Sequence, residues 1–364
     1  MEDSPKEHRF PCGDCGSDMR YDAAASMLVC DHCGNTEAVE NNPDSNWQIT
    51  EQDFHKALRD ELPESEMETT RVSKCENCGA EVEFEGENHA SECPFCASPI
   101  VLDTGTNKHI KPKGVLPFSV AEKAARDAMS DWLGRLWFAP NNLKEYARKG
   151  RKMQGIYVPY WTYDSQSESD YRGQRGDAYY VNRTVVVNGK TETRRERKIR
   201  WRPASGHISR FFDDILILAS KSLPKKYTDK LAPWDLSELE AYSPDFLAGF
   251  NAEAYSVQLA DGFEEAKIIM DHEIRRLVRR DIGGDEQRIS RLDTQLSDIT
   301  YKHVLLPVWL AAYKYNGQTF RFVVNGRTGK VQGERPWSKA KIALAVVAGL
   351  IIAGAAVYFI QANQ

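Results

Sequence analysis

The longest apolar run in the chain lies close to its C-terminus, at residues 342–360. These nineteen residues carry no charge. As a helix rising about 1.5 Å per residue they would span roughly 28 Å, close to the hydrocarbon thickness of a bilayer. A buried core helix is the alternative, but such helices seldom stay uncharged on all sides over this length. The pattern therefore predicts one transmembrane helix at residues 339–361.

The flanks of this run predict its orientation. Arg335, Lys339 and Lys341 precede it together with Trp337, and few residues follow it. Basic residues favour the cytoplasmic side of a membrane span, and tryptophan favours the membrane interface. Residues 1–9 are charged and lack the apolar run of a signal peptide. We therefore expect a single-pass protein whose N-terminal body is cytoplasmic.

Helical periodicity predicts three main helices in this body. A short one is expected at 50–62, with Asp53 near its start, and a longer one at 119–137, opened by a capping box of Ser119 and Glu122. A long helix is expected from Asp261 to about residue 281, and a minor one at 142–149.

From residue 155 the pattern changes to β-branched and aromatic residues with turn signals between them. We predict strands at 155–163, 179–187, 190–201, 211–219, 250–259, 286–300, 301–315, 319–324 and 330–332. Asn-Gly pairs at 188–189 and 316–317 predict hairpin turns. A Pro-x-Trp step occurs at both 159–161 and 307–309, which suggests two related β units facing each other. The body, residues 105–338, is thus predicted to be α+β and rich in antiparallel sheet with long hairpins.

The chain has 364 residues, 41% of them hydrophobic, and a net charge of -5. Its length allows several domains and a substantial core. A dedicated nucleic-acid-binding protein would usually carry a strong basic excess, so the overall charge argues against that class.

All eight cysteines occur in the first 96 residues, in two modules with the same spacing. The predicted metal ligands are Cys12, Cys15, Cys30 and Cys33 in the first module, and Cys75, Cys78, Cys93 and Cys96 in the second. Each cysteine of the first module recurs 63 positions later. Four thiolates on two tight turns suit tetrahedral zinc. We predict two zinc ribbons, at residues 1–40 and 71–104, each holding one zinc ion and joined by a helix and linker at 41–70.

Two alternatives to zinc remain open at this stage. Four thiolates also accept iron, and spacing alone does not separate the two metals. A redox dithiol is less compatible, because such motifs come as one pair that opens a helix. His32 and His89 lie near the cysteines, but the four-cysteine pattern leaves no ligand position for them.

No pattern in the chain predicts an enzyme. The only phosphate-loop lookalike is at 189–191, where the required upstream glycine is replaced by Thr184. His207 with Asp213 and Asp214 is the remaining catalytic candidate. Asp164 with Asp170 is a further carboxylate pair, although carboxylates at strand ends are usually only solvated.

The return strand of the first hairpin is basic from Arg194 to Arg202. A contact with nucleic acid or lipid phosphate is one interpretation. A solvated face balanced by Asp177, Glu192 and Glu196 is the other.

The duplicated cysteine modules, followed by the runs KPKGVLPFSVAEKAAR, SGHISRFFDDILILAS and FVVNGRTGKVQGERPW, resemble a bacterial family of zinc-ribbon membrane proteins. These YdjG-type chains often carry the label primosomal protein N' (replication factor Y) superfamily II helicase, or TFIIB-type zinc ribbon-containing protein. The resemblance implies an inner-membrane adaptor that works with scaffold proteins of the SPFH or phage-shock type. It does not imply helicase activity here, because a nucleotide-binding motif is missing.

We therefore expect a non-enzymatic adaptor that recruits a protein partner to the cytoplasmic face of the bacterial inner membrane. The alternative is a nucleic-acid-binding zinc-ribbon protein linked to replication or transcription. Ala345, Gly349 and Ala353 form a stripe of small residues along the predicted span, through which two copies could pair as a homodimer.

Overall fold

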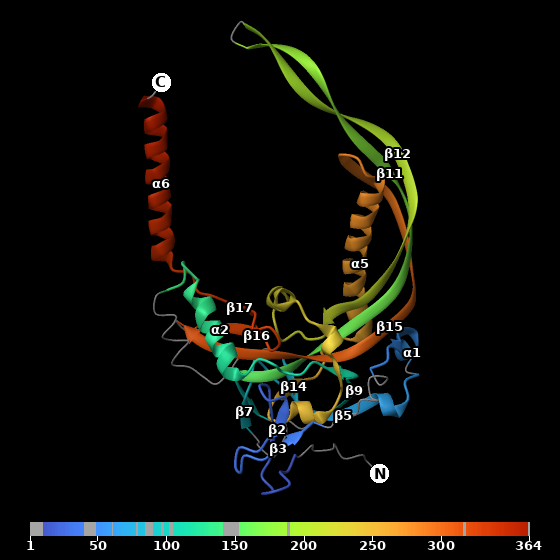
Figure 1. Cartoon of the computed structure of the whole chain (residues 1–364), viewed down its shortest axis with the longest axis vertical. Helices are drawn as coiled ribbons and strands as arrows, with labels where there is room; N and C mark the ends of the chain where they lie inside the picture. Colours follow the sequence, from blue (N-terminus) through green and yellow to red (C-terminus); the bar gives the residue numbers. More distant parts are fainter. Residues whose placement is uncertain are drawn as a thin grey trace.

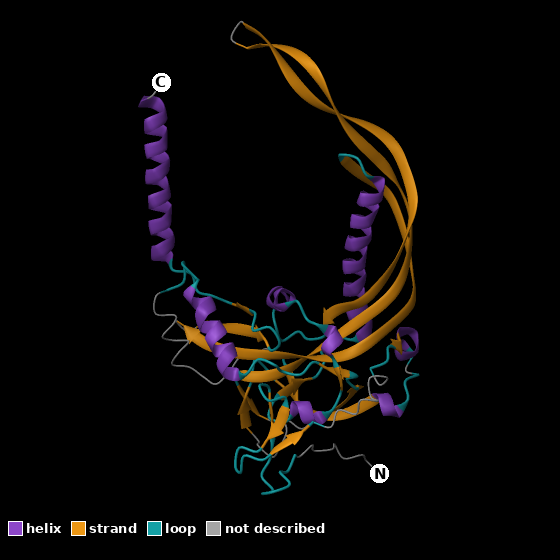
Figure 2. Cartoon of the chain, in the orientation of Figure 1, coloured by secondary structure: helices purple, strands orange, loops and turns teal. Residues whose placement is uncertain are grey.

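Three very long strands dominate the architecture. The computed structural model describes residues 10–39, 49–59, 61–77, 79–83, 90–95, 98–101, 105–140, 153–187, 190–315 and 318–362. The long strands are β11 (Gln154–Val187), β12 (Lys190–Leu218) and β15 (Glu286–Tyr315). They cross a base of short strands and helices and then rise from it as an arch (Figures 1 and 2). The protein is mixed α+β and rich in sheet, as the sequence predicts.

The main sheet is centred on β11, which pairs antiparallel with β12 on one side and with β15 on the other. Shorter strands widen its base: β4 (Gln52–Asp53), β5 (Met67–Lys74), β6 (Glu81–Glu83), β9 (Gly105–Ile110), β10 (Gly114–Val115), β13 (Glu240–Ala241), β14 (Asn251–Glu253), β16 (Gln318–Asn325) and β17 (Val331–Gly333). Two small sheets stand apart, formed by β1 (Arg20–Asp22), β2 (Met27–Val29) and β3 (Thr36–Ala38), and by β7 (Ala90–Glu92) and β8 (Pro99–Val101).

The helices are few and of unequal length. They are α1 (Phe54–Leu58), α2 (Glu122–Gly134), α4 (Lys225–Thr228), α5 (Leu259–Ile282) and α6 (Lys339–Ala362). Single 3-10 turns occur at Glu64–Glu66, Asp229–Leu231, Leu236–Glu238 and Pro244–Leu247. The helix expected at 142–149 lies outside the described residues.

Several predicted helix starts need correction. The capping box at Ser119 is wrong, because α2 begins at Glu122 and the Ser119 hydroxyl donates to the carbonyl of Arg327 instead. Asp261 is not the cap of α5, which begins earlier, at Leu259. Asp53 does cap a helix, since its carboxylate accepts from the backbone N–H of Lys56, but that helix is only five residues long.

The predicted strands at 155–163 and 179–187 belong to one strand, and so do those at 286–300 and 301–315. The polar residues in the middle of β11 led to the prediction of two separate strands. Ser165, Ser167 and Ser169 are fully buried there, on the same face as Tyr171, which bonds to Asp281 of α5. These serines belong to the strand and not to a loop, because their small side chains let α5 approach the sheet closely. The strand predicted at 250–259 is also wrong, since β14 ends at Glu253.

The β units that carry the two Pro-x-Trp steps do pair with each other, and the steps lie symmetrically on either side of the pair formed by Val158 of β11 and Leu306 of β15. At the first step, the indole N–H of Trp161 donates to the carbonyl of Val257, just before α5, at 2.9 Å. The carbonyl of Pro159 accepts from the N–H of Ala219 at 3.0 Å, and the carbonyl of Ala219 accepts from the N–H of Val257 at 3.0 Å.

The second step repeats these contacts one by one. Trp309 donates to the carbonyl of Val120, just before α2, at 2.7 Å. The carbonyl of Pro307 accepts from Gly326 at 2.8 Å, and that of Gly326 accepts from Val120 at 2.8 Å. Around these two steps the contacts are therefore related by an approximate local two-fold symmetry. In chain order α2 comes before β11, yet it packs beside β16. Likewise α5 comes before β15, yet it packs mainly on β12 and β11. Each half of the body therefore supplies the helix that packs on the other half.

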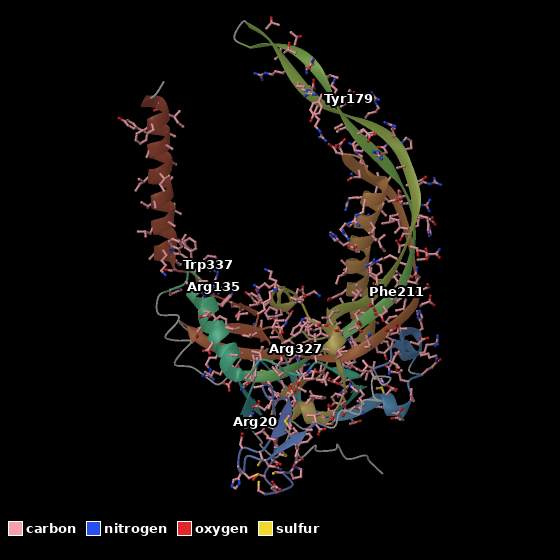
Figure 3. The ribbon with its side chains drawn as sticks, in the orientation of Figure 1. Arg20, Arg135, Tyr179, Phe211, Arg327 and Trp337 are labelled. Carbon is pink, nitrogen blue, oxygen red and sulfur yellow. The ribbon has the colours of Figure 1, made fainter. Side chains whose placement is uncertain are left out.

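The long strands bend at a pair of bulges beside Asp164. The register of β11 shifts against β12 between Tyr163 and Ser165, and against β15 between Asp164 and Gln166. On the two neighbouring strands Asp214 and Asp298 both have a φ of 51°. Bulges bend and twist a strand, and two at one level bend the whole sheet. Phe211, close to this level on β12, is labelled in Figure 3 where the strands turn upward.

A partly buried charge cluster lies at this bend, with Asp164 and Lys302 buried and Glu51 exposed. The ammonium of Lys302 is 2.8 Å from Asp214, 3.3 Å from Glu51 and 4.0 Å from Asp164. Burial, together with the neighbouring Glu51, raises the pKa of Asp164 to about 7. Near neutral pH this carboxyl group is therefore half protonated, and its ionisation opposes the fold.

We predict that Asp164→Asn stabilises the protein at neutral pH. The folded pKa of Asp164 lies above its unfolded value, so the wild type loses stability as the pH rises from about 4 to about 7, whereas asparagine does not titrate. The gain over the wild type should grow by about 2 kcal/mol between pH 5 and pH 7.5. Urea unfolding of the full chain in nanodiscs at several pH values measures it. Asp127→Asn, at an exposed position on α2 outside this cluster, is the control, and a mutant less stable at every pH would contradict the assignment.

A second prediction concerns the duplicated tryptophans. Trp161→Phe and Trp309→Phe each remove the donor to a carbonyl that precedes a helix and also leave a void. Each should cost about 2–4 kcal/mol of unfolding free energy, measured by the same urea titration. Trp337→Phe, at a side chain 55% exposed, should change it by less than about 0.5 kcal/mol. Unequal losses at the two positions would contradict their equivalence.

Candidate metal centre

Two tight turns present the cysteines of the first module. The N–H of Gly16 donates to the carbonyl of Cys12, and that of Gly34 to the carbonyl of Cys30, both at 2.9 Å. Gly16 and Gly34 have φ values of 72° and 78°, a conformation that favours glycine because a Cβ would be strained there. The glycine after each second cysteine thus allows the turn to close.

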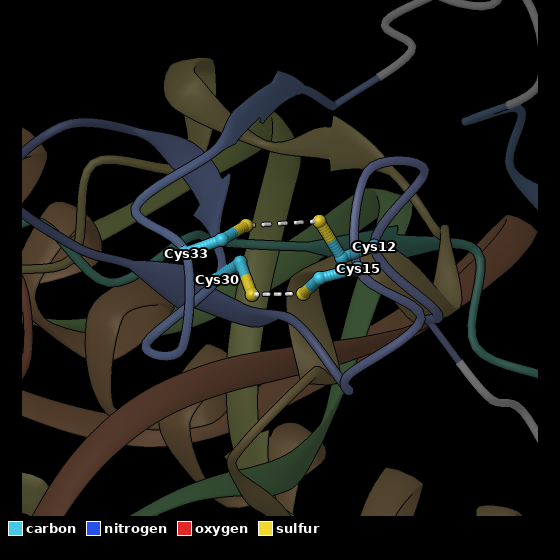
Figure 4. A group of neighbouring side chains, drawn as sticks. All are labelled: Cys12, Cys15, Cys30 and Cys33. Carbon is cyan, nitrogen blue, oxygen red and sulfur yellow. Dashed lines mark hydrogen bonds between the residues drawn. The ribbon is translucent and has the colours of Figure 1, made fainter.

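These turns bring four sulfurs together (Figure 4). The Sγ atoms of Cys12 and Cys33 are 3.5 Å apart, as are those of Cys15 and Cys30, and all four lie within 4.8 Å of one another. A disulfide would need about 2.05 Å. A tetrahedral zinc with Zn–S bonds of about 2.3 Å requires sulfurs about 3.8 Å apart. The spacing therefore fits a four-thiolate metal centre.

The turns also favour thiolates. Backbone N–H groups of Cys15 and Asp14 bond to the sulfur of Cys12 and lower its pKa. Hydrogen bonds from the backbone and hydroxyl of Ser17 lower the pKa of Cys15 to about 6. For Cys33 the N–H of Asn35 acts in the same direction, but the neighbouring thiols and burial raise its pKa to about 12. The Cys33 thiol thus keeps a proton that a metal ion would displace.

The first module is fixed to the body. The N–H of Tyr21 donates to the carbonyl of Ala248 at 2.9 Å, and its ring packs on Phe246 with centroids 5.5 Å apart. Cys12 and Cys30 are buried in the same apolar cluster as Phe118 and Trp309, while Cys15 and Cys33 are exposed. Figure 1 places β2 and β3 at the end of the molecule opposite α6. The two exposed sulfurs therefore belong to a surface far from that helix.

The second module repeats the backbone turns in its described part. The N–H of Cys75 donates to Ala80 and that of Gly79 to Cys75, at 2.8 and 2.7 Å, as in the first module. Cys93 likewise donates to Ser98 at 2.8 Å, and both Cys75 and Cys93 are buried. The other predicted ligands, Cys78 and Cys96, and also His89, lie outside the described residues. Among the described residues, four cysteine sulfurs are therefore brought together only in the first module.

The other residues considered as metal ligands or catalytic groups are not part of the four-cysteine cluster. His32 is exposed beside the cluster but is not among its four ligands. His207 bonds to Glu168 at 2.7 Å and to Asp170 at 3.0 Å, six residues along β12 from Asp213. The described residues therefore do not bring His207 and the aspartate pair together.

Glu51, Asp164 and Asp213 form a second group whose oxygens lie close together. No local pattern predicted this group, because Glu51 is more than a hundred residues from the other two in the chain. Lys302 already supplies a cation there. We therefore assign these three carboxylates a structural role at the bend of the sheet.

The helix α6 has the composition of a membrane span. Residues Lys339–Gln361 are long and apolar enough to cross a bilayer, and their most apolar window is not buried against the body. At its base, the ammonium of Lys341 donates to the carbonyl of Ala139 at 2.8 Å, and Trp137 is 82% exposed. Figure 3 shows Trp337 at this base. The helix indicates membrane association. That Trp137 lies beside the base of α6, where its carbonyl accepts from Lys341, could not be predicted from its neighbours in the chain.

No protein-family model matches the chain, and no solved structure matches it. It is similar to the uncharacterized protein YdjG of Bacillus subtilis (strain 168), with 28% identity over 341 residues that cover 92% of each chain. This likeness over almost the full length agrees with the resemblance drawn from the sequence motifs, and it carries no assigned activity.

Proposed function

We propose that the protein is a non-enzymatic adaptor, held in the cytoplasmic membrane by α6, which recruits a protein partner through its zinc-binding modules. The observation that carries this proposal is the cluster of four cysteine sulfurs within 4.8 Å of one another. A zinc ion with four protein ligands has no open position for substrate. Such a site stabilises a small module and shapes its surface.

The placement of the modules supports a recruiting role. The first module and α6 lie at opposite ends of the molecule (Figure 1). With α6 in the bilayer and the basic flank at Lys339 and Lys341 on the cytoplasmic side, the exposed turns at Cys15 and Cys33 point into the cytoplasm. A partner held there would be kept at the membrane without touching it.

The partner class that we propose is a membrane scaffold of the SPFH or phage-shock type, which follows from the family resemblance. The second module, through Cys75, Cys78, Cys93 and Cys96, would hold a second zinc ion. Homodimerisation through Ala345, Gly349 and Ala353 is compatible with this arrangement, because α6 leaves this stripe exposed.

We predict that Cys33→Ser lowers the zinc content of the purified full chain from two ions to one. Serine does not replace a thiolate ligand, and metal binding supplies on the order of 10 kcal/mol to the folding of a small zinc module. Elemental analysis by mass spectrometry gives the metal and its count. His32→Ala, next to the site but outside its ligand set, should retain both ions. Iron in the wild type, or two ions in Cys33→Ser, would contradict the assignment.

Partner recruitment gives a further prediction. Cys30→Ser and Cys93→Ser should each abolish capture of the scaffold from detergent-solubilised membranes, while the protein still sediments with the membrane through α6. Affinity capture followed by mass spectrometry, with His32→Ala as the matched control, measures both. Undiminished capture by the cysteine variants would refute recruitment through the modules.

A further inference from the structure

The outer part of the β11–β12 hairpin is a ribbon of only two strands. β15 begins at Glu286, which pairs with Gly176 of β11. Beyond that point, residues 177–187 pair only with residues 190–200. We call this segment the distal ribbon. In Figure 1 it extends past the top of α5 and bends over toward the side of the molecule from which α6 leaves.

The distal ribbon is basic in an otherwise acidic chain. Residues 177–200 include seven basic and three acidic side chains, whereas the whole chain has a net charge of -5. Arg183 lies directly opposite Arg194 across the two strands. Like charges at such positions destabilise a strand pair. Arg183 also lies 3.8 Å from the carboxylate of Glu196 on the same strand pair.

Aromatic and basic side chains are interleaved on this ribbon. The guanidinium of Arg195 lies 4.6 Å from the ring centre of Tyr180, and that of Arg200 lies 5.2 Å from that of Tyr179. Tyr180 is 55% exposed. Within the described part of the chain, neither Arg195 nor Lys198 forms an ion pair with a carboxylate. These side chains are available to an external anion, and exposed tyrosine is typical of the membrane interface.

The position of α6 restricts where the bilayer can lie. Among the described residues, the hydrogen bonds that join the start of α6 to the body come from Ser338, which donates to Phe138, and from Lys341, which donates to Trp137 and Ala139. Its direction is therefore set by the connection at 334–338. The charged ribbon does not enter hydrocarbon at acceptable cost. For the bilayer surface to meet both the base of α6 and the tip of the ribbon, α6 must turn at this connection.

We propose that the distal ribbon binds the anionic phospholipid headgroups of the membrane that α6 crosses. Lys198, Arg200 and Tyr179 lie on one face of the ribbon, and Arg195 and Tyr180 on the other. The headgroups would therefore surround the ribbon, with phosphates at Arg195, Lys198 and Arg200 and with both tyrosines at headgroup depth. The tether favours lipid over nucleic acid, because α6 keeps the ribbon near the bilayer and so gives the headgroups a high effective concentration. This contact is independent of partner recruitment by the zinc modules.

The test uses the full chain in nanodiscs of phosphatidylcholine, with or without about 30% phosphatidylglycerol, and measures backbone hydrogen exchange across residues 177–200. Each basic residue near an anionic surface adds about fivefold to binding. We therefore expect exchange at least about fivefold slower in the anionic discs, and a return to the faster rate at high salt. The triple variant Arg195→Gln, Lys198→Gln, Arg200→Gln should exchange equally in both discs.

The matched control is the triple variant Arg275→Gln, Arg276→Gln, Arg279→Gln on α5, which removes the same charge elsewhere and should keep the protection. Equal exchange of the wild type in the two kinds of disc would overturn the proposal. So would slow exchange caused by a short DNA duplex in phosphatidylcholine discs without any effect of phosphatidylglycerol, because the ribbon would then be a nucleic-acid surface.

Discussion

The antiparallel pairing of β11 with β15 is the contact on which the other parts of the body depend. Residues 154–163 lie opposite residues 301–310, and almost all of these side chains are buried. The register places Trp161 and Trp309 symmetrically about Val158 and Leu306. Each indole then fixes the chain just before a helix. A shift of one residue would reverse the faces of both strands and detach both helices at once.

Much of the architecture could be predicted from local patterns. The Pro-x-Trp steps indicated the facing β units, and the uncharged run near the C-terminus indicated α6. The length of the strands could not be predicted in this way, because Ser165, Ser167 and Ser169 look like loop residues until α5 covers them. The bend was also invisible, since its charges come from Glu51, Asp164 and Lys302, which meet only in the folded chain.

The cysteine spacing predicted the candidate metal centre well in one module. Turns closed by Gly16 and Gly34 bring four sulfurs to distances that suit a metal. The spacing did not reveal that the module packs on the body through Tyr21 and Phe246. Apolar packing of this kind supplements what metal binding contributes to a small fold. It also means that the surface of the module keeps a fixed direction relative to the sheet.

The exchange of helices between the two halves has a consequence for synthesis on the ribosome. When α2, β11 and β12 have emerged, α5 and β15 are still missing, so neither the face of β11 that α5 covers nor its edge toward β15 is protected. Contacts between residues so distant in sequence form slowly. Until β15 is complete, residues 154–176 of β11 lack their partner on that edge, and a long open edge of this kind is prone to aggregation.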